Sequence, residues 1–398
     1  MIKAFLICLS LLCTDGCAAK GVKEMSDKET VKIMCASDLH YLSEELYDPA
    51  SAIFAKVLEK NDGKLIEGGS AILKALKEKA LEEKPDVLLL AGDITFNGEM
   101  ISLKEIASVL KEIEEGGVPV LVTTGNHDIY YSSCMTYFGD LPQMTEDISD
   151  AEYAEVLGAF GYEEALKRDE KTLSYVYELN DHLWFLVLDA NSLTSRGSIP
   201  GETLSWMDEV LSESEEKGIT VIAMSHQNVL IQSEMMYMGY VLDNHTAVEN
   251  ILRDHDVNLV ISGHSHLQHT AESDGLTDIC CESLSVYPLQ YGLIDYNTGT
   301  HEFTHKLATL GILEQESFDR FEETVLRMVS AEAEKASDDE AIQKEMEEFA
   351  VQINAAYFSG NHERIRSLMN ENGRTLWETY GADSFWSLYI RNIFSEVD

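Results

Sequence analysis

The sequence predicts an α/β (α+β) fold in which β-sheets are flanked by helices and a small helical domain lies at the C-terminus. Two observations lead to this fold class. Up to about residue 312, short apolar runs alternate with amphipathic helical patterns. From about residue 315 the chain is helical in pattern and strongly charged, and it ends in an aromatic-rich run.

Each predicted strand is a short apolar run that ends in polar residues, and each predicted helix has apolar residues at helical spacing. Strands are expected at residues 31–37, 86–92, 118–124, 219–225 and 257–263, with a hairpin formed by 173–179 and 183–189. Helices are expected at residues 70–84, 101–115 and 204–218. Because strands and helices alternate along the chain, we expect sheets that are covered by helices.

The chain is long for one domain, and the change of pattern divides it. We expect a leader at residues 1–17, a catalytic domain at 30–312 and a helical domain at 315–398. The helical domain should pack through Trp377, Phe385, Trp386 and Phe394. Two roles for this domain remain open, a structural cap and a wall of the substrate entrance.

The N-terminus has the pattern of a targeting segment. Lys3 precedes an apolar run from Ala4 to Cys13, which is too short to span a bilayer, and Gly16 precedes Cys17. This resembles a bacterial lipoprotein signal, and a plain secretory leader is the alternative. Either leader predicts an extracytoplasmic protein, secreted or anchored to the bacterial membrane by a lipid on Cys17.

Charge and cysteine content restrict the possible partners and cross-links. The chain has 71 acidic and 29 basic residues, a formal net charge of −42. Such a surface repels the phosphate backbone of long nucleic acids, whose binding requires clustered Lys and Arg. Outside the leader, Cys35, Cys134, Cys280 and Cys281 lack the spacing of a disulfide framework and are expected as buried thiols, with a disulfide of Cys134 left open.

Five polar clusters follow five predicted strands, and together they carry the chemistry. They are Asp38-Leu39-His40, Gly92-Asp93, Gly125-Asn126-His127-Asp128, Ser225-His226 and Gly263-His264-Ser265-His266. Imidazole and carboxylate groups are donors for Mn, Fe, Zn or Ni. In an extended segment, the alternate residues of D-L-H and H-S-H would point the same way and could share one ion or divide between two.

The order DLH, GD, GNHD, H, GHSH resembles that of the calcineurin-like metallophosphoesterase family, over roughly residues 31–295. The resemblance implies a two-sheet β-sandwich flanked by helices, with a dinuclear metal centre at one edge. Carried over to this sequence, it implies two ligand sets and one bridging residue. One divalent ion would be held by Asp38, His40 and His266, the other by Asn126, His226 and His264, and Asp93 would bridge them.

Two further segments point to a branch of that family. GDITFNGE at residues 92–99 and SLSVYPLQYG at 283–292 resemble secreted bacterial proteins grouped with the class III cyclic-nucleotide phosphodiesterases. Purple acid phosphatases have a Tyr ligand three residues after the bridging Asp, where this chain has Phe96, which cannot coordinate a metal. The DNA-repair nuclease branch has similar metal motifs, but the leader and the acidic charge disfavour it.

The expected reaction is hydrolysis of a small phosphate ester by a hydroxide that bridges the two metals, most simply a phosphodiesterase acting on small nucleotides, including cyclic ones. His127 is expected to be the general acid, with Asp128 orienting its ring. The alternatives are a phosphomonoesterase or nucleotidase with the same metals and, more remotely, a non-enzymatic surface binding protein. The aromatic stretch 129–168 could stack on a base or simply pack, and no protein partner is inferred.

Overall fold

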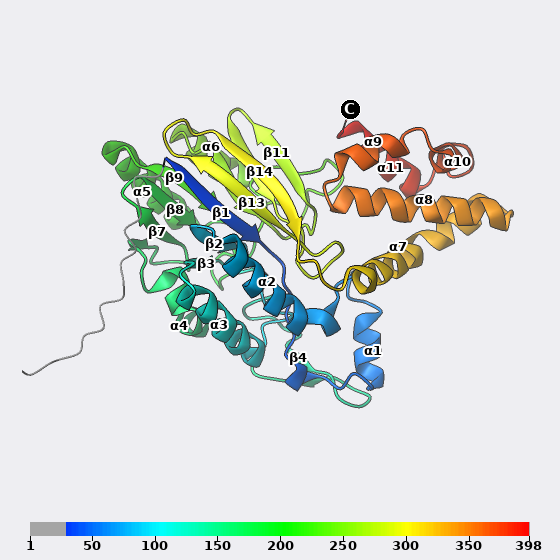
Figure 1. Ribbon diagram of the computed structural model, residues 1–398, viewed down its shortest axis with the longest axis horizontal. Coiled ribbons are helices and arrows are strands. Elements are labelled where there is room, and N and C mark those ends of the chain that lie inside the picture. Colours follow the sequence, from blue (N-terminus) through cyan, green and yellow to red (C-terminus); the bar gives the residue numbers. More distant parts are fainter. Residues whose placement is uncertain (1–28, 398) are drawn as a thin grey trace, which may run out of the picture.

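The computed structural model describes residues 29–397, so the predicted leader and Cys17 lie outside the described residues. Two mixed β-sheets form the centre of the molecule, and helices α2 and α3 lie beside the strands β1 to β3 (Figure 1). The C-terminal helices stand together at one end of the sheets (Figure 1). This is the predicted fold class, a β-sandwich flanked by helices with C-terminal helices added.

The first sheet has five strands in the order β14-β13-β1-β2-β3. Strands β1, β2 and β3 run parallel, whereas β13 pairs with β1 and β14 in antiparallel fashion. The strands are β1 (Thr30–Ala36), β2 (Val87–Leu90), β3 (Val120–Val122), β13 (Gln290–Asn297) and β14 (Phe303–Thr309).

The second sheet has seven strands in the order β11-β12-β10-β9-β8-β7-β6. Its central strands β8, β9, β10 and β12 are parallel. The strands are β6 (Lys167–Arg168), β7 (Tyr175–Asn180), β8 (Leu183–Val187), β9 (Thr220–Met224), β10 (Leu259–Ser262), β11 (His269–Ser273) and β12 (Leu276–Cys280). A separate two-stranded hairpin consists of β4 (Met135–Thr136) and β5 (Gln143–Met144).

Strand β8 is a continuous apolar run because each of its two faces is buried in a different hydrophobic core. Leu183, Phe185 and Val187 join the core that also contains β1 to β3 and helix α2. Trp184 and Leu186 join a second core with residues of α5 and α6. A strand that is buried on both faces has no polar side, so the alternating pattern of a half-exposed strand is absent.

The remaining elements connect or cover the two sheets. Those of the catalytic region are η1 (Glu44–Leu46), α1 (Ala52–Leu58), η2 (Ile66–Gly68), α2 (Gly69–Glu83), α3 (Met100–Glu115), α4 (Asp150–Val156), the π-helical turn η3 (Gly158–Tyr162), α5 (Gly201–Lys217) and α6 (His245–Asp254). Helix α5 ends at Gly218, whose φ of 67° is the left-handed conformation that glycine adopts readily at helix ends.

The C-terminal helices are α7 (Glu314–Ala336), α8 (Glu340–Phe358), α9 (His362–Leu368), α10 (Asn372–Tyr380) and α11 (Phe385–Ser395). They have their own hydrophobic core, which includes Trp377, Trp386 and Phe394 as predicted, whereas Phe385 is 56% exposed. Two residues of the catalytic region, Leu267 and Val286, belong to the same core. We call this set of buried residues the helical core.

The four cysteines of the described chain are free thiols, and all four are buried. Cys134 therefore packs as a thiol, and the alternative of a disulfide is not supported. Within residues 29–397, no helix has the length and apolar character needed to cross a bilayer.

Candidate metal centre

The predicted ligands lie directly after strands whose C-terminal ends meet. Parallel strands place their carboxyl ends at one edge, where ligands bind in open α/β sheets. Asp38 and His40 follow β1, Asp93 follows β2, Asn126 follows β3, His226 follows β9, and His264 and His266 follow β10. All seven predicted ligands therefore come from strand ends of the two facing sheets.

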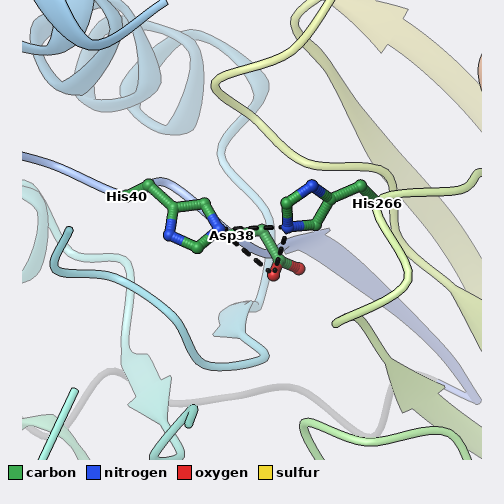
Figure 2. A group of neighbouring side chains, drawn as sticks. All are labelled: Asp38, His40 and His266. Atoms are coloured by element: carbon green, nitrogen blue, oxygen red, sulfur yellow. Dashed lines mark hydrogen bonds and ion pairs between the residues drawn. The ribbon is translucent and has the colours of Figure 1, made fainter. Parts of the chain in front are cut away.

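One group of donors consists of Asp38, His40 and His266, whose side chains point toward one another (Figure 2). A ligand atom from each lies within 4.8 Å of the others. The Nε2 atoms of His40 and His266 are 3.0 Å apart, and Asp38 Oδ1 is 3.3 Å from His266 Nε2. Asp38 Oδ1 is buried and has no hydrogen-bond partner among the described residues. A bound cation would compensate this buried oxygen by coordinating it.

A second group consists of Asp93, His226 and His264, again with ligand atoms within 4.8 Å. His226 Nδ1 donates to the Ala91 carbonyl at 2.7 Å, which leaves Nε2 as the free donor to a metal. His264 Nε2 donates to the Gly239 carbonyl at 2.7 Å, which leaves Nδ1. Such contacts fix the tautomer of a metal-binding histidine.

Asp93 and Asn126 complete the predicted arrangement. Asp93 Oδ2 is 3.4 Å from His226 Nε2 and 3.8 Å from His40 Nε2, so this carboxylate lies between the two groups. Asn126 Oδ1 is 3.1 Å from His226 Nε2. The geometry is that of a bridging carboxylate and a ligand amide, and the ligand roles themselves remain predictions.

The backbone of the paired motifs is not extended, which corrects the reason given for their pairing. Asp38, His40, His264 and His266 have φ values of 53°, 46°, 69° and 55°. Left-handed backbone is uncommon for residues other than glycine and is concentrated at functional sites. The turn after β1 brings Asp38 and His40 into one group, whereas the turn after β10 divides His264 and His266 between the two.

Two glycines permit the close approach of these loops. A side-chain carbon on Gly125 would overlap the backbone nitrogen of Asp93, and one on Gly263 would overlap the Ser37 hydroxyl next to Asp38. The GNHD and GHSH loops can therefore meet the β1 and β2 loops only because these positions lack a Cβ.

The carboxylates and histidines of the two donor groups shift one another's pKa values. Burial would raise the pKa of Asp93, but His226, His127 and His40 hold it well below its usual range. Burial would lower the pKa of His226, but Asp93 and Asp38 raise it to about 9. Burial, helped by the charge of His226, lowers the pKa of His264 to about 4. A buried carboxylate that recruits a cationic partner in this way is suited to a metal ion.

His127 lies next to the first donor group, with its ring 5.0 Å from the His40 ring. It is half-buried, and its ring stacks on Tyr131 at a centroid distance of 4.6 Å. Its Nδ1 faces the Phe96 carbonyl at 2.9 Å and Asn97 Oδ1 at 3.1 Å. The prediction that Asp128 orients this ring is therefore wrong.

Asp128 instead holds the loop together. Its carboxylate accepts from the Thr95 backbone at 2.9 Å, from the Thr95 hydroxyl at 2.8 Å and from the Gly125 backbone at 2.8 Å. Burial and the charge of Asp93 raise its pKa to about 7. Asp128 is fully buried, and these three donors compensate its carboxylate. It therefore stabilises the GNHD loop and does not contact the His127 ring.

Lys64 is a buried lysine that sequence reasoning did not single out. It is only 6% exposed, and in the described chain its Nζ makes no hydrogen bond or ion pair. Burial lowers its pKa, opposed by the charges of Asp62, Asp93 and Asp38, and its own charge helps to lower the pKa of His40 and His127. No motif marks a single lysine in this acidic chain, so only folding reveals it.

The aromatic stretch divides between packing and the site. Tyr137 and Tyr153 are buried at 5% and 0% exposure and pack in cores, whereas Phe138 is exposed. Only Tyr131 contacts a predicted catalytic side chain, through its stacking on His127. Stacking on a substrate base is therefore not available to Tyr137 or Tyr153.

A two-sheet sandwich whose strand ends present two adjoining groups of His and Asp donors defines the class of metal-dependent hydrolases. Residues 31–268 match the family model described as calcineurin-like phosphoesterase. This chain therefore belongs to the calcineurin-like phosphoesterase family and is a metal-dependent phosphoester hydrolase. The non-enzymatic alternative is set aside.

Two relatives and one solved structure show how far the similarity extends. A Synechococcus protein named "Probable cyclic nucleotide phosphodiesterase" is 26% identical over 251 residues, which is 63% of this chain and 79% of the relative. A Psychrobacter arcticus protein of the same name is 23% identical over 209 residues, 52% of this chain and 65% of the relative. The crystal structure of a dimetal phosphatase from Danio rerio has 16% identity and a TM-score of 0.48, covering 69% of this chain and 98% of that one.

Proposed function

We propose that the protein hydrolyses phosphodiesters of small nucleotides, including cyclic nucleotides. The observation that carries this proposal is the pair of donor groups with Asp93 between them and the half-buried His127 next to them. Two relatives named for cyclic nucleotide phosphodiesterase activity support the same substrate class.

The donor atoms fit two divalent transition-metal ions. Asp38, His40 and His266 would hold one, and Asn126, His226 and His264 would hold the other, with Asp93 shared. Bound there, two such ions would activate a water molecule and neutralise charge on the phosphate. The Ala91 and Gly239 carbonyls keep the donor nitrogens of His226 and His264 directed at the centre.

The protein's own groups would act on the substrate in two ways. His127 is held through Nδ1 by Phe96 and Asn97, and in its imidazolium form it would give the proton on Nε2 to the departing ester oxygen. The side chain of Lys64, a residue that is only 6% exposed, would bind a non-bridging phosphate oxygen through its ammonium group. The same cation favours the second candidate, a phosphomonoesterase or nucleotidase, because a monoester carries an additional negative charge.

The cellular setting is also a proposal. The leader-like sequence at residues 1–17 supports an extracytoplasmic enzyme, secreted or lipid-anchored at Cys17. The net charge of −42 supports a small substrate rather than a long nucleic acid.

The test is hydrolysis of bis(p-nitrophenyl) phosphate and p-nitrophenyl phosphate by protein that is stripped of metal with a chelator and reloaded with Mn²⁺. The proposal expects metal-dependent cleavage that favours the diester, followed by cleavage of cyclic nucleotides. A preference for the monoester would transfer the function to the second candidate. Protein that binds two equivalents of metal and cleaves neither ester would contradict both.

A further inference from the structure

The segment after β10 is held by the C-terminal helices. Leu267, which directly follows His266, is fully buried and belongs to the helical core that also contains Phe321 and Phe349. The next residue, Gln268, donates its backbone N–H to the Phe358 carbonyl at 2.8 Å. The C-terminal end of α8 thus forms a backbone hydrogen bond two residues from a predicted metal ligand.

This contact is close enough to require a glycine. Gly360 has a φ of 66°, and a Cβ at this position would lie 2.9 Å from the Gln268 carbonyl oxygen. The adjacent Ser359 carbonyl accepts from Gln290 Nε2 at 3.1 Å. The turn after α8 is therefore fitted against the strand ends of the catalytic region.

A second connection reaches His264. Met235 and Met236 pack against the helical core, and Asn392 of α11 donates to the Ser233 hydroxyl at 3.4 Å. The loop that begins with these residues ends at Gly239, whose carbonyl accepts from His264 Nε2 at 2.7 Å. The C-terminal helices thus contact the loop that contains Gly239. The Gly239 carbonyl accepts from His264 Nε2 and leaves Nδ1 of His264 free to bind a metal.

A third connection reaches Asp38. Val286 belongs to the helical core, and the neighbouring Ser285 and Ser283 donate their hydroxyls to the Asp38 carbonyl at 3.2 Å and 2.8 Å. The three connections lie in different parts of the chain, yet each ends at a predicted ligand with left-handed backbone. None of these ligands lies within a helix or strand, so the hydrogen bonds of their own elements cannot hold them.

We propose that the C-terminal helices position the metal centre, and that their docking on the catalytic region sets its affinity for divalent metal. This role goes beyond a cap or a wall of the substrate entrance, and it rests on the metal centre of the proposed function. Residues that orient metal ligands typically change metal affinity by about 10-fold to 100-fold when altered.

The test compares Gly360→Ala with Gly218→Ala in the full-length chain. Both glycines have nearly the same φ, 66° and 67°, so alanine causes similar backbone strain at each. Only at position 360 does the new methyl group collide with the segment that follows His266, because a Cβ at position 218 would have no atom beyond its chain neighbours within 4 Å. Mn²⁺ affinity is measured by calorimetric titration of chelator-stripped protein, at a temperature where both variants are folded by circular dichroism.

We expect Gly360→Ala to bind Mn²⁺ about 10-fold more weakly than the parent and Gly218→Ala to bind as the parent does. Equal affinity of Gly360→Ala and the parent would overturn the proposal, as would equal weakening in both variants, since metal loss would then follow destabilisation alone. Should Gly360→Ala fail to fold, Asn392→Ala removes the α11 contact and is expected to weaken Mn²⁺ binding several-fold, with unchanged affinity contradicting the proposal. Because the measurement is metal binding, it can be read even if the parent cleaves neither ester.

Discussion

The Nε2 atoms of His40 and His266 lie 3.0 Å apart although 226 positions separate the two residues in the sequence. Asp38 Oδ1 completes the group, and it is buried without a hydrogen-bond partner in residues 29–397, as the predicted ligand role requires. Three buried or half-buried donors directed at one point are difficult to explain by packing, because uncompensated polar groups are costly to bury.

Replacing His266 with alanine is expected to remove one of the two metals. The other donor group, built on Asp93, His226 and His264, does not include this residue. Metal content measured by mass spectrometry after desalting should fall from about two equivalents to about one. His182→Ala, at an exposed position of the β7–β8 hairpin, is the control and should retain both metals. Full metal content in the His266 variant would remove it from the ligand set.

His127→Ala is expected to retain metal and lose turnover by about 10²-fold or more, because a general acid contributes about that much. The loss should depend on the leaving group. Diesters with a p-nitrophenolate leaving group need little protonation, so they should lose less than nucleotide diesters with an alkoxide leaving group. A loss that is equal for both kinds of substrate would indicate that His127 positions the substrate and does not donate a proton.

Lys64→Met is expected to raise KM by about 10-fold with a smaller change in kcat, because it removes a cation that binds phosphate in the ground state as well as in the transition state. Methionine is apolar and fits a buried position. Metal content should be unchanged, since Lys64 contributes no ligand atom to either donor group. Lys60→Met, which changes an exposed lysine of the same segment, is the matched control. An unchanged KM would show that Lys64 does not contact the substrate.

Glu282 makes stability depend on pH. Glu282 is 1% exposed, and burial raises its pKa well above the usual range, although the Gln290 side chain offsets part of that rise. The folded protein therefore binds a proton that the unfolded chain releases above its ordinary pKa near 4.5. As the pH rises from the unfolded-state pKa of Glu282 toward its folded-state pKa, the free energy of unfolding should fall by about 1.4 kcal/mol per pH unit.

Glu282→Gln removes this titration and keeps the shape of the side chain. Thermal melts of the variant and the parent should nearly coincide at pH 4, and the variant should melt at the higher temperature at pH 8. A difference in melting temperature that stays constant between pH 4 and pH 8 would mean that Glu282 is not protonated in the folded protein. The measurement is made without added metal, so that metal binding does not contribute its own pH dependence.

Much of the fold and the metal centre could be predicted because their signals are local. Apolar runs such as VLLL at β2 end at the polar residues that follow them, and the turn after each strand carries its own donor, as at Asp93 and Asn126. Parallel strands must then bring these donors to one edge. The prediction that Asp128 orients the His127 ring relied on their adjacency in the chain. The Asp128 side chain instead turns beneath the loop and hydrogen-bonds Thr95.

The sequence by itself determined the fold class and the family and it predicted the candidate donor residues, since each depends on residue types and their order along the chain. Only the tertiary structure decided the rest: the left-handed turns that divide His264 from His266, the burial of Lys64, and the three contacts from the C-terminal helices. These depend on residues distant in sequence that meet through packing, such as Gly360 against Gln268. No spacing rule along one chain encodes such contacts, because many different sequences can bring two loops to the same distance.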